Sequence, residues 1–285
     1  MKSKLQFAFA MAAFGTIPLF VRNIPISSAT LALLRAVIAA AFLLVFRAVT
    51  RNPVRFRQMG KDAVPLFLSG AAMGFNWILL FEAYKYTTVS VATLSYYFAP
   101  VIVTVVSAFL FREKLTLKQT LCFVGSTVGL VLVIGLNNLT GGASMKGVLF
   151  GLGAAVLYAT VILLNKRIKN VGGIDRTVLQ FLAAAVVLTP YLLLTEGFHM
   201  ESMTAAGWVN LAIVGLFHTG ITYALYFSAL HKIRGQEAAI LSYIDPLVAC
   251  VLSFTLLHEP TTALQLIGGA MILGFTLLNE VGCAD

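Results

Sequence analysis

The sequence predicts an all-α integral membrane protein whose ten transmembrane helices form two inverted five-helix repeats. First, 59% of its 285 residues are hydrophobic and only 11% are charged, whereas a soluble domain carries about 25% charged residues. Second, apolar runs of about 20 residues follow one another, each long enough to cross a bilayer as a helix. Third, the second half of the chain repeats part of the first. Transmembrane strands would alternate apolar and polar residues, and these runs do not.

Ten apolar runs account for the expected helices, because each can cover the roughly 30 Å hydrocarbon core. The first run could be a signal peptide, since Lys2 and Lys4 precede it. However, residues 13–16 (Ala-Phe-Gly-Thr) resemble residues 157–160 (Leu-Tyr-Ala-Thr) in the sixth run, which favours a span that belongs to the repeat. The expected spans are 5–22, 28–49, 62–84, 88–110, 117–136, 146–167, 175–195, 205–230, 236–257 and 261–280.

A repeat within the chain appears when the sequence is shifted by 146 positions, which aligns residues 79–119 with a later stretch without a gap. Helix composition explains the Leu, Val and Ala matches but not the polar and proline ones, so the match indicates duplication. These informative matches are Tyr97 with Tyr243, Pro100 with Pro246, Glu113 with Glu259, Thr116 with Thr262, and Gln119 with Gln265.

The two halves should enter the membrane in opposite directions, because each holds an odd number of spans. The loop charges agree: the loop after the fourth span contains Arg112, Lys114 and Lys118, whereas its counterpart at 258–260 contains no Lys or Arg. Inverted repeats are a recurring architecture of secondary transporters, with the substrate site near the midplane between the halves. The expected domains are a first repeat at 1–136, a connector at 137–145 and a second repeat at 146–285.

Positive charge is distributed unequally between the two sides of the membrane. The loops on one side carry 16 Lys and Arg residues and those on the other carry three, while Arg35 lies inside the second span. Cytoplasmic loops hold the excess of Lys and Arg. We therefore expect a multi-pass protein of the cell inner (plasma) membrane with both termini in the cytoplasm. The lipid bilayer is the expected partner, and the net charge of +9 needs no nucleic acid to explain it.

Signatures of other functions do not occur in the sequence. It contains no Gly-x-x-x-x-Gly-Lys loop for ATP and no His-Glu-x-x-His zinc motif. Its three cysteines lack the spacing of a metal or disulfide framework, so we expect no cofactor and no metal. Asp245 and His218 lie at comparable depth and could serve an intramembrane enzyme, but the inverted repeat favours transport.

Pairs of glycines four residues apart place small residues on one face of a helix, where another helix can approach closely. Packing within the chain explains them better than a dimer face, and a monomer or a homodimer both remain open. The pairs are Gly70 with Gly74, Gly125 with Gly129, and Gly147 with Gly151.

A set of residues recurs in the same order in the two halves, with a Leu-Leu-Arg run in the second span. They are Leu33, Leu34 and Arg35; Pro100, Glu113, Thr116, Gln119, Gly125 and Gly129; and Pro246, Glu259, Thr262, Gln265, Gly268 and Gly269. With these residues the chain resembles the drug/metabolite transporter (DMT) superfamily, in its EamA branch, over nearly its whole length. The resemblance implies a central cavity lined by spans one to four and six to nine, with spans five and ten peripheral, and transport of small molecules by alternating access. Known members include exporters of amino acids, importers of amines and choline-like compounds, and nucleotide-sugar carriers.

Asp245 is the strongest candidate for a substrate-binding residue. It falls near the middle of the ninth span, where a charge costs about 2.5–3.5 kcal/mol on insertion scales and normally faces a cavity or a partner. We expect it to bind a cationic group or to carry a coupling proton; its counterpart in the first repeat, Ala99, is neutral. Alternatively, Asp245 pairs with Arg35 or caps a helix that is broken at Pro246.

Polar and aromatic residues in the neighbouring spans complete the predicted substrate site. Aromatic faces attract cations, although ordinary packing explains several of them equally well. Arg35 could bind a substrate carboxylate, but a structural role is the better interpretation, and a lone His218 is most often a core histidine. The predicted substrate-binding residues are Asp245, Tyr243, Tyr97, Trp77, Tyr223, His218, Asn76, Arg35 and Tyr96.

Four further residues are predicted to serve as hinges or structural anchors. Pro100 and Pro246 lack the usual helix hydrogen bond and should kink their spans, as a hinge or as an inert bend. Glu113 and Glu259 precede the fifth and tenth spans, where helix capping and loop anchoring explain them.

These features together predict a secondary transporter of a small metabolite, an amino acid or amine-type compound that is exported by alternating access. Proton coupling is possible through Asp245. Two alternatives of the same fold are an importer of a cationic or quaternary amine, such as a choline-like compound, and an uncoupled facilitator.

Overall fold

The computed structural model describes residues 2–52, 54, 60–111, 116–135, 143–171, 173–230, 232–233 and 235–281. Within these residues the chain is helical and forms no strand. In the described ranges, eight helical stretches are long and apolar enough to cross a membrane, and two shorter apolar helices, Ile240–Thr255 and Ala263–Asn279, occupy the last two predicted spans. The predicted all-α membrane fold is therefore confirmed.

The first half begins with α1 (Lys2–Gly15) and the short α2 (Ile17–Val21). It continues with α3 (Ser28–Val49), η2 (Gly60–Asp62), α4 (Ala63–Tyr86), α5 (Val89–Tyr96), α6 (Ala99–Phe111) and α7 (Leu117–Ile134).

The second half contains α8 (Ala143–Asn165), α9 (Gly173–Thr195), α10 (Ala205–Ala212), the π-helix η4 (Ile213–Ile221), α11 (Thr222–Leu230), α12 (Gly235–Ser242), α13 (Ile244–Thr255) and α14 (Ala263–Val281). The helix ends fall within about three residues of the predicted spans, which is the usual uncertainty of such boundaries.

The fourth and ninth spans are each broken into two helices at matching positions of the repeat. Pro100 is the second residue of α6 and Pro246 the third residue of α13. In the first turn of a helix the backbone N–H has no partner within the helix, so proline is tolerated there. The two prolines thus lie in the first turns of new helices, so each span is interrupted next to its proline, and a role of the prolines as hinges stays a prediction.

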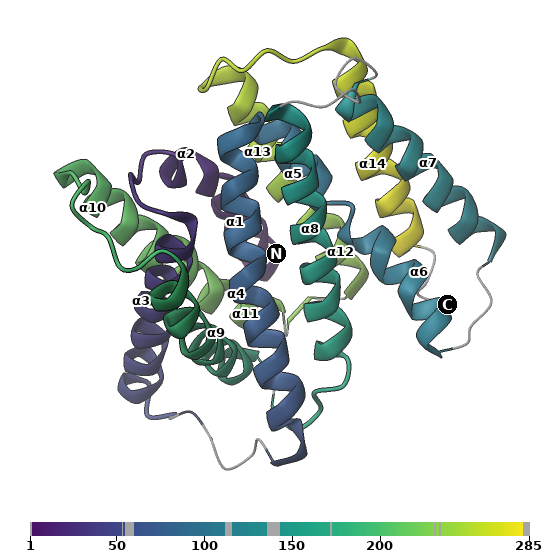
Figure 1. Ribbon diagram of the computed structural model, residues 1–285. Helices are drawn as coiled ribbons and strands as arrows, with labels where there is room; N and C mark the ends of the chain where they lie inside the picture. The colour runs from purple at the N-terminus through teal and green to yellow at the C-terminus, as the bar shows by residue number, and fades with distance from the viewer. Residues whose placement is uncertain are drawn as a thin grey trace.

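The spans divide into a packed centre and a peripheral pair. In the centre, α4 packs against α8 and α9, α3 packs against α9, and α1 packs against α11 and α13. Helices α7 and α14 pack mainly against each other and stand at the right of Figure 1. The fifth and tenth spans are therefore peripheral, as the family resemblance implies.

Small residues allow α7 and α14 to approach closely. A Cβ atom built on Gly129 would lie 2.7 Å from the carbonyl oxygen of Gly268, closer than real Cβ atoms come. Gly70 and Gly74 similarly face Gln180 and Leu188 of α9. These glycines therefore pack helices within one chain, which is the interpretation that the sequence favoured.

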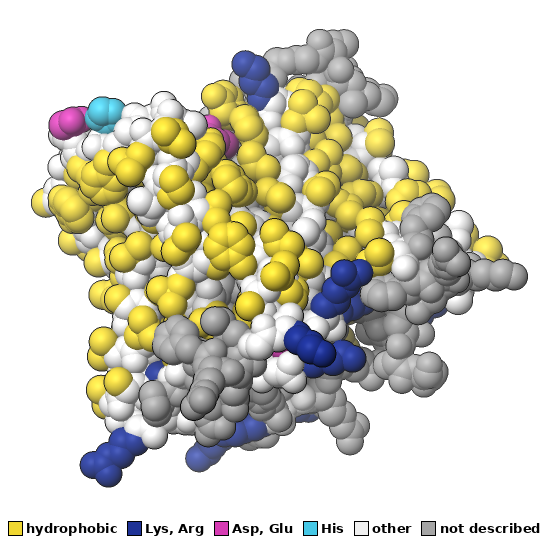
Figure 2. All heavy atoms as spheres, turned by 60° about the horizontal axis from the view of Figure 1, so that its bottom comes forward, with side chains coloured by type: hydrophobic (Ala, Val, Ile, Leu, Met, Phe, Trp, Pro, Cys, Tyr) yellow, Lys and Arg dark blue, Asp and Glu magenta, His cyan; other side chains and the backbone are white. Residues whose placement is uncertain are grey.

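The exterior of the molecule matches a multi-pass membrane protein. Figure 2 shows hydrophobic side chains over most of the visible flank, while most visible Lys and Arg side chains gather toward one end. Large apolar side chains such as Leu194, Leu193 and Leu266 are more than half exposed. Such an apolar belt suits contact with lipid acyl chains.

The close approach of α7 and α14 predicts opposite effects of two glycine substitutions. Gly129→Ala should lower the free energy of unfolding by about 1–3 kcal/mol, the usual cost of overpacking. Gly274→Ala is the matched control, because no atom lies within 4 Å of the added Cβ, and alanine favours a helix over glycine by up to about 1 kcal/mol. The measurement is the midpoint of thermal unfolding in detergent micelles. Equal midpoints for the two variants would contradict the close approach.

Candidate functional site

The two broken spans bring one residue from each repeat into direct contact. Tyr97 caps the end of α5, and its hydroxyl donates a hydrogen bond to the Oδ2 atom of Asp245 over 2.5 Å. Asp245 is the second residue of α13, immediately after the second break. Both side chains are half-buried. A hydrogen bond to a charged acceptor is short and strong, so this pair links the repeats where their helices are interrupted.

Aromatic rings surround this pair. The Tyr96 ring lies 5.8 Å from that of Tyr97 and 5.2 Å from that of Tyr158, centroid to centroid. Tyr243, the repeat counterpart of Tyr97, is buried at the N-cap of α13. The structure thus brings Tyr96, Tyr97 and Asp245 together, and adds Tyr158, which the sequence suggests only through its resemblance to the first span.

A second group forms around Arg35, which is buried inside α3. Its guanidinium carbon lies 4.4 Å from the centroid of the Trp77 ring, and its Nε atom donates a hydrogen bond to Thr219 over 2.7 Å. The Phe181 ring joins Trp77 to Tyr223, with centroid distances of 5.5 and 5.4 Å. The structure therefore places Arg35, Trp77 and Tyr223 in one aromatic group.

The alternative pairing of Arg35 with Asp245 does not occur among the described residues. Arg35 is held by Thr219 and Trp77, while Asp245 is held by Tyr97. The Tyr223 ring lies 5.0 Å from the Phe14 ring of α1, and the next residue, Gly15, packs against the backbone carbonyl of Asp245. The two groups are therefore connected through α1, and no ion pair joins their charges among the described residues.

The π-helix η4 positions Thr219 and His218. Side chains of His218, Thr219 and Thr222 contact the backbone carbonyls of Ile213, Val214 and Phe217, each five residues earlier. Short π-helical segments often mark functional sites. Gly215 and Gly220 of this segment pack closely against Ile38 and Phe42 of α3, a contact between distant spans that the sequence does not indicate.

His218 and Asn76 both make contacts within the fold. The Nε2 atom of His218 lies 2.8 Å from the Thr16 hydroxyl, at the break between α1 and α2, and its Nδ1 atom lies 3.3 Å from the Ile213 carbonyl. The side-chain amide of Asn76 donates to the Ala154 carbonyl over 2.6 Å. Both residues are buried, and the contacts of their side chains are with other residues of the protein. Direct contact of either residue with a substrate therefore stays a prediction.

The predicted anchor residues take different positions. Glu259 contacts the first residue of α5, where its Oε2 atom accepts a hydrogen bond from the Val89 N–H over 2.8 Å, and it forms an ion pair with Arg22. Sequence reasoning missed Arg22, because the repeat register contains no clue to it. Glu113 lies outside the described residues.

The two groups offer complementary chemistry to a ligand. A carboxylate among aromatic rings suits an ammonium group, which is attracted to the ring faces. A guanidinium with free N–H donors suits a carboxylate or another planar anion. A small molecule that carries both charges could address both groups.

Comparisons with known proteins show which family the chain belongs to. The chain matches the EamA-like transporter family over residues 2–135 and 145–280. It is 27% identical to the uncharacterized transporter YxxF of Bacillus subtilis, over 99% of this chain and 91% of that protein. It is 29% identical to an uncharacterized transporter of Archaeoglobus fulgidus, over 93% of this chain and 91% of that protein.

A third relative and a solved structure agree with this. Protein PecM of Dickeya dadantii is 26% identical over 78% of this chain and 77% of its own length. A crystal structure with 18% sequence identity superposes with a TM-score of 0.68 and covers 99% of this chain and 98% of that one, which shows a shared fold. The chain is therefore a membrane transporter that belongs to the EamA-like transporter family.

Proposed function

We propose that the protein is a secondary transporter that exports a small metabolite with an amino group, an amino acid or amine-type compound, by alternating access. The observation that carries the proposal is the Asp245–Tyr97 pair, which lies at the helix breaks where the two repeats meet. Interrupted helices at a repeat interface are where secondary transporters bind substrate.

The surroundings of Asp245 favour a ligand role over a purely structural one. A carboxylate within a membrane span marks a substrate or ion pathway unless it is fully paired. Among the described residues, the Tyr97 hydroxyl is the one hydrogen-bond partner of this carboxylate. The second oxygen is thus available to an ammonium group or a proton.

The neighbouring Arg35 favours an amino acid over a purely cationic amine. Its Nε atom is occupied by Thr219, whereas its two terminal nitrogens make no hydrogen bond with a described residue. A bidentate fork of this kind matches a carboxylate. A substrate with both charges could satisfy Asp245 and Arg35 at once, which a choline-like cation could not.

The direction of transport and the orientation are part of the proposal. The unequal loop charges support cytoplasmic termini in the inner membrane. Export is the direction that we propose, because the superfamily that the chain resembles includes exporters of amino acids. An importer of cationic amines is the second candidate, favoured by the aromatic rings around the acid.

Substitution of Asp245 should remove recognition of the amino group. Asp245→Asn keeps the side-chain shape but loses the charge, and a charged hydrogen bond contributes about 1.5–3 kcal/mol, or about ten- to a hundredfold in affinity. The measurement is flux in proteoliposomes of neutral and aromatic amino acids, cationic amines and choline-like compounds, with and without a pH gradient. Glu82→Gln, which breaks an exposed pair within α4, is the control. A folded Asp245→Asn variant with unchanged transport and unchanged pH dependence would make Asp245 structural.

Substitution of Arg35 should change selectivity rather than abolish transport. Arg35→Gln removes the positive charge that would bind a carboxylate. It should reduce transport of an amino acid about tenfold relative to transport of the corresponding amine, which has no carboxylate. Thr219→Val is the matched control, because it removes the anchor of Arg35 but not its charge. If Arg35→Gln lowers both rates equally along with the thermal midpoint, Arg35 only supports the fold.

A further inference from the structure

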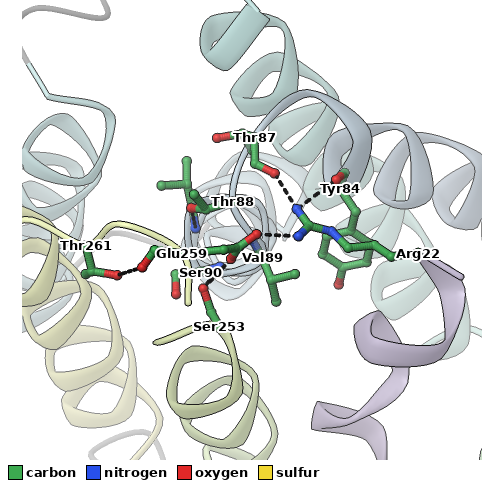
Figure 3. Close-up of polar contacts among 10 residues, drawn as sticks. Arg22, Tyr84, Thr87, Thr88, Val89, Ser90, Ser253, Glu259 and Thr261 are labelled. Atoms are coloured by element: carbon green, nitrogen blue, oxygen red, sulfur yellow. Dashed lines mark hydrogen bonds and ion pairs between the residues drawn. The ribbon is translucent and has the colours of Figure 1, made fainter. Parts of the chain in front are cut away.

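Glu259 joins several helix ends at the end of the molecule that carries few Lys and Arg residues in its loops. It lies in the connection between α13 and α14, and its carboxylate pairs with the guanidinium of Arg22 (Figure 3). It also accepts hydrogen bonds from the Val89 N–H at 2.8 Å and from the Ser253 hydroxyl. The Ser90 N–H in turn reaches the Ser253 oxygen at 3.4 Å. We call these five residues the Glu259 cluster.

Arg22 extends the cluster to two further helices. It follows α2, and its Nη2 atom donates to the carbonyl oxygens of Tyr84 at 3.0 Å and Thr87 at 2.9 Å, at the end of α4. The cluster therefore ties together the ends of α2, α4, α5 and α13. In Figure 3 the side chains of Arg22 and Glu259 reach toward each other from opposite sides of the α5 N-terminus.

Each charge in the cluster is matched to a helix end. The Glu259 carboxylate sits at the N-terminus of α5, where the helix dipole is positive, and Arg22 sits at the C-terminus of α4, where it is negative. The exposed fractions of the two side chains are 28% for Arg22 and 10% for Glu259. These partners exist together only while the four helix ends converge. The cluster is thus suited to two discrete states, made or broken.

The cluster stands on the same two helices as the candidate substrate site. Val89 begins α5 and Tyr97 follows its end; Asp245 begins α13 and Ser253 lies near its end. Eight residues separate the members of each pair, which is about 12 Å at 1.5 Å per residue. The Glu259 cluster therefore joins α5 to α13 about two helical turns beyond the Asp245–Tyr97 pair.

We propose that the Arg22–Glu259 ion pair, with Val89 and Ser253, is a gate that closes the substrate pathway at this end of the molecule. The gate must break for the pathway to open there. The loop charges place this end outside the cell, so the structure represents an externally closed state. This inference rests on the proposed alternating access, but it does not depend on the identity of the substrate.

Labelling of an introduced cysteine tests the gate without any substrate. Thr93 lies on the same face of α5 as Ser90 and Tyr97, between the gate and Asp245. Thr93→Cys would be made in a background whose three native cysteines are replaced by serine. A membrane-impermeant thiol reagent is then applied to right-side-out and to inside-out vesicles. With the gate intact, we expect slow labelling from the external face.

Two gate variants and one control decide the outcome. Glu259→Gln should raise the labelling rate from the external face about tenfold, and Ser253→Ala should raise it less, in the same direction. Glu82→Gln breaks an exposed ion pair within α4 near the same end and should leave the rate unchanged. An unchanged rate in both gate variants, or an equal rise from both faces, would overturn the gate. Normal transport by Asp245→Asn with the expected labelling would refute the substrate site and leave the gate standing.

Discussion

A polar side chain that this chain carries into the bilayer finds its partners inside the fold, because lipid offers none. That constraint accounts for the contacts between distant spans. Asp245 receives a hydroxyl from Tyr97, Arg35 lies against Trp77 and donates to Thr219, and His218 meets Thr16. The Asp245–Tyr97, Arg35–Thr219 and His218–Thr16 contacts each join the first half of the chain to the second. The polar groups therefore determine how the two halves meet.

The sequence predicted the scaffold well and the contacts poorly, for a physical reason. Hydropathy and the repeat can be read along the chain, so the spans and the matched prolines followed from them, whereas the peripheral position of the fifth and tenth spans followed from the family resemblance. The Tyr97–Asp245 and Arg22–Glu259 contacts depend on how two inverted halves lie against each other, which no pattern along the chain records. The close packing of the π-helix against α3 is likewise a contact between distant parts of the chain.

The repeat also separates residues that build the scaffold from residues that supply chemistry. Tyr97 and Tyr243, like Pro100 and Pro246, keep matching positions at the two breaks. Asp245 has only Ala99 as its counterpart, so the acid is an addition to one half. The residues that match between the repeats thus build two similar helix breaks. The unmatched Asp245 is the residue that we assign to recognition of the substrate.

The pairing of α7 with α14 has a thermodynamic consequence. Each is the fifth span of its half, so an exchange of conformations between the halves would map this interface onto itself. A contact that is equal in two states contributes to the stability of both and shifts the balance between them in neither direction. The glycine-lined contact between α7 and α14 would then stabilise both states equally, whereas the proposed Arg22–Glu259 gate would stabilise only one of them. Mutations in this contact would lower the stability of the protein without altering the side of the membrane to which the substrate pathway opens.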